Sequence, residues 1–197
     1  MRVTLTAVCA AAAMAASLPA AASVVTYFTT LSGAAEIPPN ASPGTGSATV
    51  TYDDSTSKLS LHVEFTGLIG TTTASHIHCC TAAAGAGTAG VATTTPTFAG
   101  FPLGVHSGIY DALLDLDAAT SWNPGFISSH GATIASAKSD FLTGLSAGKT
   151  YLNVHSTFAP GGEIRGFLQQ VPEPASYGLA LGGLAMLALA RRRRPAN

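Results

Sequence analysis

The sequence predicts an all-β fold: an antiparallel β-sandwich of Ig-like or Greek-key type with one short inserted helix. Three observations support this prediction. Apolar and polar residues alternate over several segments of strand length, Thr, Val, Gly and Pro are plentiful between them, and helical spacing occurs in one segment only. The two ends of the 197-residue chain are apolar and follow different patterns, so we expect one domain over residues 23–170, flanked by two targeting segments.

Residues 1–22 predict a secretory signal peptide. Arg2 precedes an apolar run over residues 3–18, and small residues follow at positions 20–22, which is the order of charge, apolar run and A-x-A cleavage site. The alternative, a retained membrane anchor, is disfavoured because the run is short and rich in Ala. Cleavage after Ala22 would remove Cys9 and place the remaining chain outside the cytoplasm.

The first hairpin is expected over residues 47–65. In "SATVTY" and "KLSLHVEF" the apolar residues fall on one face and polar residues, His62 among them, fall on the other. The polar stretch at 53–58 between them is turn-like, so these two strands are expected to pair directly.

A second hairpin is expected near the end of the domain, where "YLNVHST" at 151–157 and "GEIRGFL" at 162–168 are separated by a short turn. Residues 132–148, "ATIASAKSDFLTGLSAG", place their apolar residues at helical spacing and end near Gly148, which predicts the inserted helix. The small, Gly-rich stretch 81–104 predicts a long loop with a short strand near Val91.

The C-terminal segment predicts a short transmembrane helix over residues 177–190. These fourteen residues carry no charge, and at 1.5 Å per residue they span about 21 Å of the ~30 Å hydrocarbon core. A helix that continues into the following basic residues, whose side chains can snorkel, covers part of the difference. The basic cluster is expected to stay cytoplasmic; it comprises Arg191, Arg192, Arg193 and Arg194.

This end of the chain resembles the PEP-CTERM sorting signal. The motif "VPEP", a short apolar helix and an Arg run occur in that order over residues 171–194. The resemblance implies recognition and processing by an exosortase-type membrane enzyme in a Gram-negative bacterium that makes exopolysaccharide, with delivery to the cell surface or the surrounding matrix. It makes Pro172, Glu173 and Pro174 a sorting motif and not an active site.

The domain between the two ends is acidic. Residues 23–171 hold four Lys or Arg and nine Asp or Glu, a formal charge of −5. A domain of this charge without a basic stripe is not expected to bind nucleic acid. The charge can attract cations or basic partners, or it can serve solubility alone.

Four segments resemble the CHRD domain, named for its repeats in chordin. They are "LSGAAEIPP" at 31–39, "SHIH" at 75–78, "YLNVHS" at 151–156 and "GGEIRGFL" at 161–168, and together they span nearly all of the domain. This chain has one copy and lacks the other modules of chordin, so growth-factor binding does not carry over. The resemblance implies an exported β-rich domain without an assigned activity.

Three histidines form a candidate site for copper or zinc. On a strand, His76 and His78 project from the same face, with Cα atoms about 6.5–7 Å apart. His155 falls on the polar face of its own strand. Three neutral imidazoles suit Zn²⁺ or Cu²⁺ and leave a coordination position open. The alternative is a purely structural role, in which these rings hydrogen-bond across a polar sheet face. Further candidates for this site are Cys79 or Cys80 as a soft ligand, Glu163 as a partner that fixes a tautomer, and His106 or His130 as a fourth ligand.

Cys79 and Cys80 are the only cysteines left after signal cleavage. Their Cα atoms lie about 3.8 Å apart, closer than the ~4.4–6.8 Å of ordinary disulfides. They can be free, bridged to each other or bonded to another chain. Glu163 and Arg165 lie two apart and are expected to form an ion pair or a hydrogen-bond clamp to neighbouring loops.

The sequence favours a non-enzymatic surface or matrix component. No Ser-His-Asp order, phosphate loop or paired-carboxylate pattern is present. "HIH" on a β-sandwich resembles copper-zinc superoxide dismutase, but the bridging histidine, zinc loop and long-range disulfide of that enzyme cannot be placed here. The alternative function is a metal-binding protein centred on the three histidines, scavenging or redox-active.

Overall fold

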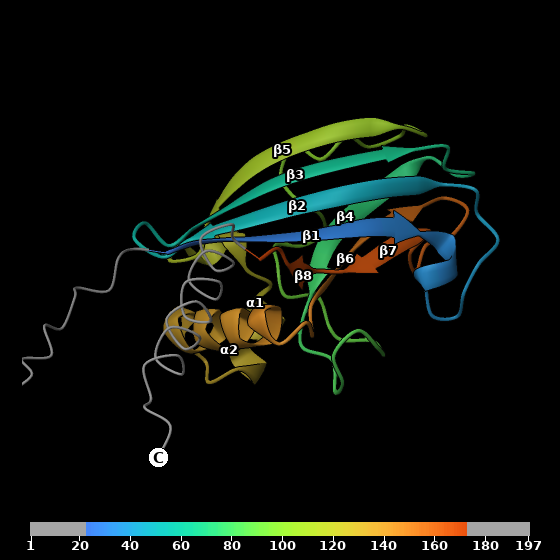
Figure 1. The fold of residues 1–197 in the computed structure, drawn as a ribbon. Coiled ribbons are helices and arrows are strands. Elements are labelled where there is room, and N and C mark those ends of the chain that lie inside the picture. Colours follow the sequence, from blue (N-terminus) through green and yellow to red (C-terminus); the bar gives the residue numbers. More distant parts are fainter. Residues whose placement is uncertain (1–22, 173–197) are drawn as a thin grey trace, which may run out of the picture.

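The computed structural model describes residues 23–172, which form a curled β-sheet with two α-helices packed beneath one end (Figure 1). The predicted signal peptide, transmembrane helix and arginine run, with Glu173 and Pro174, lie outside the described residues. The elements in chain order are β1 (Val24–Ser32), the 3₁₀ turn η1 (Gly33–Ala35), β2 (Thr45–Asp53), β3 (Lys58–Thr66), β4 (Thr72–His78), β5 (Gly108–Asp115), η2 (Ala119–Ser121), α1 (Pro124–Ser129), α2 (Ile134–Ser146), β6 (Tyr151–Ser156), β7 (Ile164–Phe167) and β8 (Gln169–Gln170).

The strands pair antiparallel in the order β4-β6-β7-β1-β2-β3-β5, with β8 added to β1. The expected all-β antiparallel class is confirmed, but one curled sheet takes the place of two separate sheets. The strands β1 and β7 are paired through Ser32 and Arg165 alone. Because so few hydrogen bonds join them, β4-β6-β7 can turn away beneath β1-β2-β3, and the core lies between the two halves.

Both predicted hairpins are confirmed. The strands β2 and β3 pair with Val50 opposite Leu61, and both side chains are buried. The strands β6 and β7 pair with Val154 opposite Ile164, again with both side chains in the core. The alternation of apolar residues therefore identified the inward faces of these strands correctly.

The predicted helix is confirmed as α2, where a capping box between Thr133 and Ser136 fixes the first turn and Phe141 and Leu145 enter the core. The shorter α1 was not predicted, because six residues are too few for a helical period to emerge. Among the described residues, no helix combines the length and apolar character needed to cross a bilayer.

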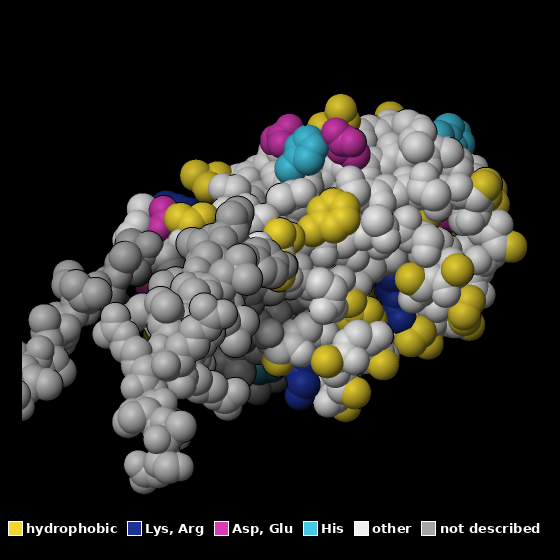
Figure 2. Space-filling model, in the orientation of Figure 1, with side chains coloured by type: hydrophobic (Ala, Val, Ile, Leu, Met, Phe, Trp, Pro, Cys, Tyr) yellow, Lys and Arg dark blue, Asp and Glu magenta, His cyan; other side chains and the backbone are white. Residues whose placement is uncertain are grey.

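Most side chains of β4, β6 and β7 are buried, although Thr73 is exposed, whereas the outward face of β1-β2-β3-β5 is accessible to solvent. Figure 2 shows few charged side chains on the visible surface, and two acidic ones lie beside a histidine. The free edge of β4 is covered by the predicted loop, which returns along it: Ala92 N–H donates to Ile77 O, and Val91 forms an isolated bridge with His78. This covered half of the sheet carries the candidate site.

Candidate metal site

The structure brings the three predicted histidines together on the outer face of β4 and β6. Ala74 is paired with His155, and His76 with Asn153, so the antiparallel register places the rings side by side. Ile77 and Leu152 point the opposite way, into the core. Each histidine offers one nitrogen, and the three nitrogens lie within 4.8 Å of one another.

A backbone carbonyl fixes the tautomer of each ring. His76 donates through Nε2 to Pro96 O at 2.6 Å, His78 through Nδ1 to Ala89 O at 2.9 Å, and His155 through Nδ1 to Pro160 O at 2.8 Å. A carbonyl oxygen can only accept, so these nitrogens carry the protons. The other nitrogen of each neutral ring therefore presents a lone pair, as metal-binding histidines do.

Two of these lone pairs face each other directly. His76 Nδ1 lies 3.3 Å from His155 Nε2. Two nitrogens bound to one tetrahedral zinc at ~2.0–2.1 Å are about 3.3–3.4 Å apart. A direct hydrogen bond between the two rings would need an added proton or the loss of one carbonyl contact, whereas a shared cation satisfies both lone pairs at once.

The third ring lies against Tyr151 and Asn153. The His78 ring stacks on that of Tyr151 with centroids 4.6 Å apart, and His78 Nε2 lies 3.1 Å from Asn153 Oδ1. Both of these atoms are acceptors in this tautomer, so a hydrogen bond between them would need the Asn153 amide turned to present its NH₂ group. On the other side of Tyr151, the Arg165 guanidinium carbon lies 4.7 Å from the ring centroid. Asn153 was not identified from the sequence, although it precedes His155 by two residues in "YLNVHS" and therefore lies on the same face of the strand.

Burial keeps the imidazoles neutral. It lowers the pKa of His76 to about 4, and it lowers the pKa of His78 and of His155 as well. The carbonyl contacts oppose this effect but do not cancel it. All three rings are thus in the protonation state that binds metal at neutral pH.

Arg165 pairs with Glu36 and not with Glu163. The Arg165 side chain is buried, its Nε donates to Ala35 O at 2.5 Å, and it lies 3.7 Å from Glu36 Oε2. Glu36 Oε1 has no hydrogen-bond partner among the described residues. Burial raises the pKa of Glu36 to about 7, and the Arg165 charge offsets only part of that rise.

Glu163 holds loops together and contacts none of the histidines. It is fully buried and accepts hydrogen bonds from Ile69 N at 2.6 Å, Gly70 N at 3.2 Å, Ser42 Oγ at 2.5 Å and Ser156 Oγ. Burial raises its pKa, but the four donors together outweigh burial and lower it. The tautomer-fixing role expected of Glu163 belongs instead to carbonyls of loop residues, for which the sequence holds no signal.

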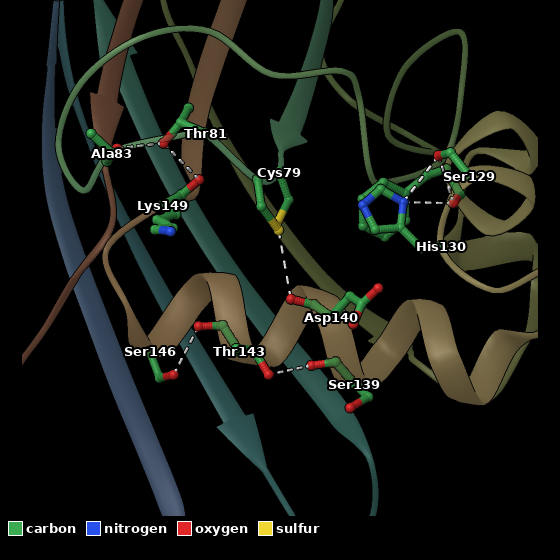
Figure 3. Close-up of a disulfide and its surroundings, with 12 residues drawn as sticks. Cys79, Thr81, Ala83, Ser129, His130, Ser139, Asp140, Thr143, Ser146 and Lys149 are labelled. Carbon is green, nitrogen blue, oxygen red and sulfur yellow. Dashed lines mark hydrogen bonds between the residues drawn. A yellow bond between two sulfur atoms is a disulfide. The ribbon is translucent and has the colours of Figure 1, made fainter.

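The remaining candidates point elsewhere. Cys79 and Cys80 form a disulfide with each other, Cys79 within the core and Cys80 against α2 (Figure 3). His106 contacts Leu68 O, and His130 stacks on Phe126. Within residues 23–172, the three histidines are the only such group that offers a metal site.

The four CHRD-like segments meet around this site. The first carries Glu36, the second His76 and His78, the third Asn153 and His155, and the last Arg165, joined by the contacts above. The PEP-CTERM protein-sorting motif matches residues 170–194, and the CHRD domain family matches residues 27–168. No curated protein and no solved structure matches the chain. Because the CHRD match covers most of the 197 residues, the chain belongs to the CHRD domain family.

Proposed function

We propose that this protein is exported to the cell envelope of a Gram-negative bacterium, where its CHRD domain binds one copper or zinc ion through His76, His78 and His155. The single observation that carries the metal assignment is the orientation of the three rings. Each donates its N–H to a backbone carbonyl and turns its other nitrogen toward the same small volume.

The site suits holding an ion more than transforming a substrate. Three imidazoles leave one or more coordination positions, and the amide oxygen of Asn153 lies 3.1 Å from His78 Nε2. Zn²⁺ and Cu²⁺ both accept three imidazole ligands, and bound copper would make the site redox-active. The protein is proposed to be a metal-holding component of the cell surface and not an enzyme.

Export is proposed to follow the sorting motif. An exosortase-type enzyme would recognise Pro172, Glu173 and Pro174 and process the tail, while residues 177–190 anchor the chain transiently in the inner membrane. The match to the PEP-CTERM motif over residues 170–194 supports this step. Deleting residues 171–197 should abolish processing and change the fraction retained at the surface, and an unchanged mass and distribution would contradict it.

A structural role at the surface or in the matrix, without metal, is the second candidate. The observation that favours it is the exposed sheet face, where Thr49 and Thr51 of β2 lie beside His62 and Ser60 of β3. Hydroxyl-rich faces of this kind can hydrogen-bond exopolysaccharide. This candidate requires that the folded domain keep its place in the envelope when the histidine cluster is removed.

Metal analysis separates the two candidates. The full chain, purified without a His tag and dialysed against micromolar Cu²⁺ or Zn²⁺, should retain one equivalent. The double variant His76→Ala/His78→Ala should retain none, and His62→Ala, a control on the exposed face, should retain one. Circular dichroism checks that each variant is folded. A folded wild-type chain that holds no more metal than the double variant would refute the metal site.

A further inference from the structure

The Cys79–Cys80 disulfide is exposed on one sulfur only. Cys79 is 3% exposed and belongs to the hydrophobic core, whereas Cys80 is half-buried. Cys80 borders a depression of about 250 Å³ between the end of β4 and helix α2. The depression is lined by Cys80, His130, Asp140, Thr143, Gly144, Ala147 and Lys149. Figure 3 labels four of these residues: His130, Asp140, Thr143 and Lys149.

Helix α2 is shaped to receive these sulfurs. Gly144 lies beneath them, and a Cβ at this position would come within 2.6 Å of Cys79 Sγ and would also overlap Cys80 Sγ. Asp140 O lies 3.5 Å from Cys80 Sγ. A disulfide sulfur has no hydrogen to donate, so this carbonyl becomes a hydrogen-bond partner only when Cys80 is a thiol. The depression also gives a reduced Cys80 side chain room to turn away from Cys79.

We propose that Cys79–Cys80 is a thiol–disulfide exchange site for small anionic thiols. Two features of the depression indicate this class: its volume suits a tripeptide-sized molecule, and its lining holds Lys149, which has no ion pair to another described residue and can attract a carboxylate. Asp140 also lines the depression and can accept from the ammonium group that such a peptide thiol carries. The inference does not depend on metal binding, since neither cysteine belongs to the group formed by the three histidines.

The exchange proceeds through Cys80. An incoming thiolate attacks Cys80 Sγ, the sulfur that borders the depression, and forms a mixed disulfide while the bond to Cys79 Sγ breaks. The displaced Cys79 sulfur takes a proton and becomes a buried thiol. A second thiolate then attacks the sulfur of the small molecule, which releases Cys80 as a thiol and the small molecule as its own disulfide. Two thiols are oxidised and one protein disulfide is reduced, and the reverse sequence re-forms the bridge.

Glutathione is the probe for the exchange. The folded full chain is incubated with millimolar reduced glutathione and a chelator, quenched with acid and mapped by mass spectrometry. The expected product is a glutathione adduct on Cys80, with little or none on Cys79. A disulfide that reacts only after denaturation, or an adduct found mainly on Cys79, would overturn the proposal.

Single-cysteine variants repeat the test without the bridge. With glutathione disulfide as the probe, folded Cys79→Ser should be modified at Cys80, and folded Cys80→Ser should remain unmodified at Cys79 until denaturant is added. Equal rates in the two folded variants would overturn the assigned direction of attack.

A charge reversal tests the preference for anionic thiols. Lys149→Glu should slow the reaction with glutathione about threefold or more and speed the reaction with cysteamine, a cationic thiol. Lys58→Glu is the matched control, because Lys58 pairs with Asp115 away from the depression, and it should change neither rate. Equal effects of both variants, or none, would remove the anionic preference.

Discussion

Glu36→Gln should change how the stability of the domain depends on pH. Glu36 is 5% exposed, lacks a hydrogen-bond partner on Oε1 among the described residues and has a pKa of about 7 in the folded chain. In the unfolded chain its pKa returns to the ordinary value of 4.5. Gln keeps the shape of the side chain but cannot ionise, so it removes this titration alone.

The sign follows from proton binding. Between pH 4.5 and about pH 7 the folded chain holds a proton on Glu36 that the unfolded chain has lost. Rising pH therefore favours the unfolded chain. The stabilisation is fully present below pH 4.5 and is lost as the pH rises through about 7. A shift of this size is worth about 3 kcal/mol.

The buried histidines make the domain more stable as the pH rises. His76 has a pKa of about 4 in the folded chain, against the ordinary histidine value of 6.5 in the unfolded chain. Between these two values the unfolded chain holds a proton that the folded chain lacks, so the free energy of unfolding rises with pH. The two trends oppose each other in the wild-type protein. The difference between wild type and Glu36→Gln cancels the histidine contribution that both proteins share and leaves the titration of Glu36 together with its coupling to His78.

Urea unfolding at pH 4.5, 5.5, 6.5 and 7.5, with a chelator present, measures this difference. The fluorescence of Trp122, the single tryptophan of the chain and 2% exposed, reports unfolding. The free energy of unfolding of wild type minus that of Glu36→Gln should fall by about 3 kcal/mol across the range. Asp53→Asn is the control: hydrogen bonds from Ser55 hold the pKa of Asp53 below its ordinary value of 3.8, so it stays ionised throughout this range and should give a flat difference. A difference for Glu36→Gln that stays constant within about 0.5 kcal/mol would refute the reasoning.

Three further outcomes are expected. Glu163→Gln should lower the free energy of unfolding by about 2–4 kcal/mol, because the amide cannot accept all the hydrogen bonds that reach the carboxylate; a loss below about 1 kcal/mol in urea unfolding would contradict this. Gly144→Ala should cost about 1–3 kcal/mol by overpacking against the disulfide, and thermal unfolding with and without reductant should show a smaller penalty once the bridge is open. Zinc affinity, measured by competition with a chromophoric chelator, should fall less than about twofold from pH 7.5 to 6.5, because burial keeps the pKa of each ring below its usual value. A loss of about sixfold would mean that the three rings titrate as exposed histidines do.

The sequence predicted correctly which side chains share a face of each strand. Alternation in "KLSLHVEF" and "YLNVHS" identified the inward faces, and the same parity placed His155 beside His76 and His78. Parity is a local property, since successive side chains of a strand point to opposite faces wherever the strand lies in the fold.

What the sequence did not predict depends on loops. Pro96, Ala89 and Pro160 contribute backbone carbonyls, which every residue has, so no residue type marks them. Glu36 reaches Arg165 from the turn after β1, far away in the chain, and this pairing left Glu163 free for the loop at Ile69. The short α1 and the continuity of the sheet likewise depend on tertiary packing.

The two buried glutamates, Glu163 and Glu36, differ in how they respond to pH. Glu163 accepts enough hydrogen bonds to stay ionised, whereas Glu36 has no hydrogen-bond partner on Oε1 among the described residues, and burial raises its pKa to about 7. Arg165 lies between Glu36 and the Tyr151 ring, and His78 stacks on the other side of that ring.

Burial is the main cause of the lowered pKa of His78, and the charge of Arg165 adds a smaller part. Ionised Glu36 neutralises part of that charge, and protonated Glu36 does not. We therefore expect a proton on Glu36 to lower the affinity of His78 for protons and, at the proposed site, for a metal cation. Glu36, in the first CHRD-like segment, is thus expected to influence His78, in the second, through Arg165 and Tyr151.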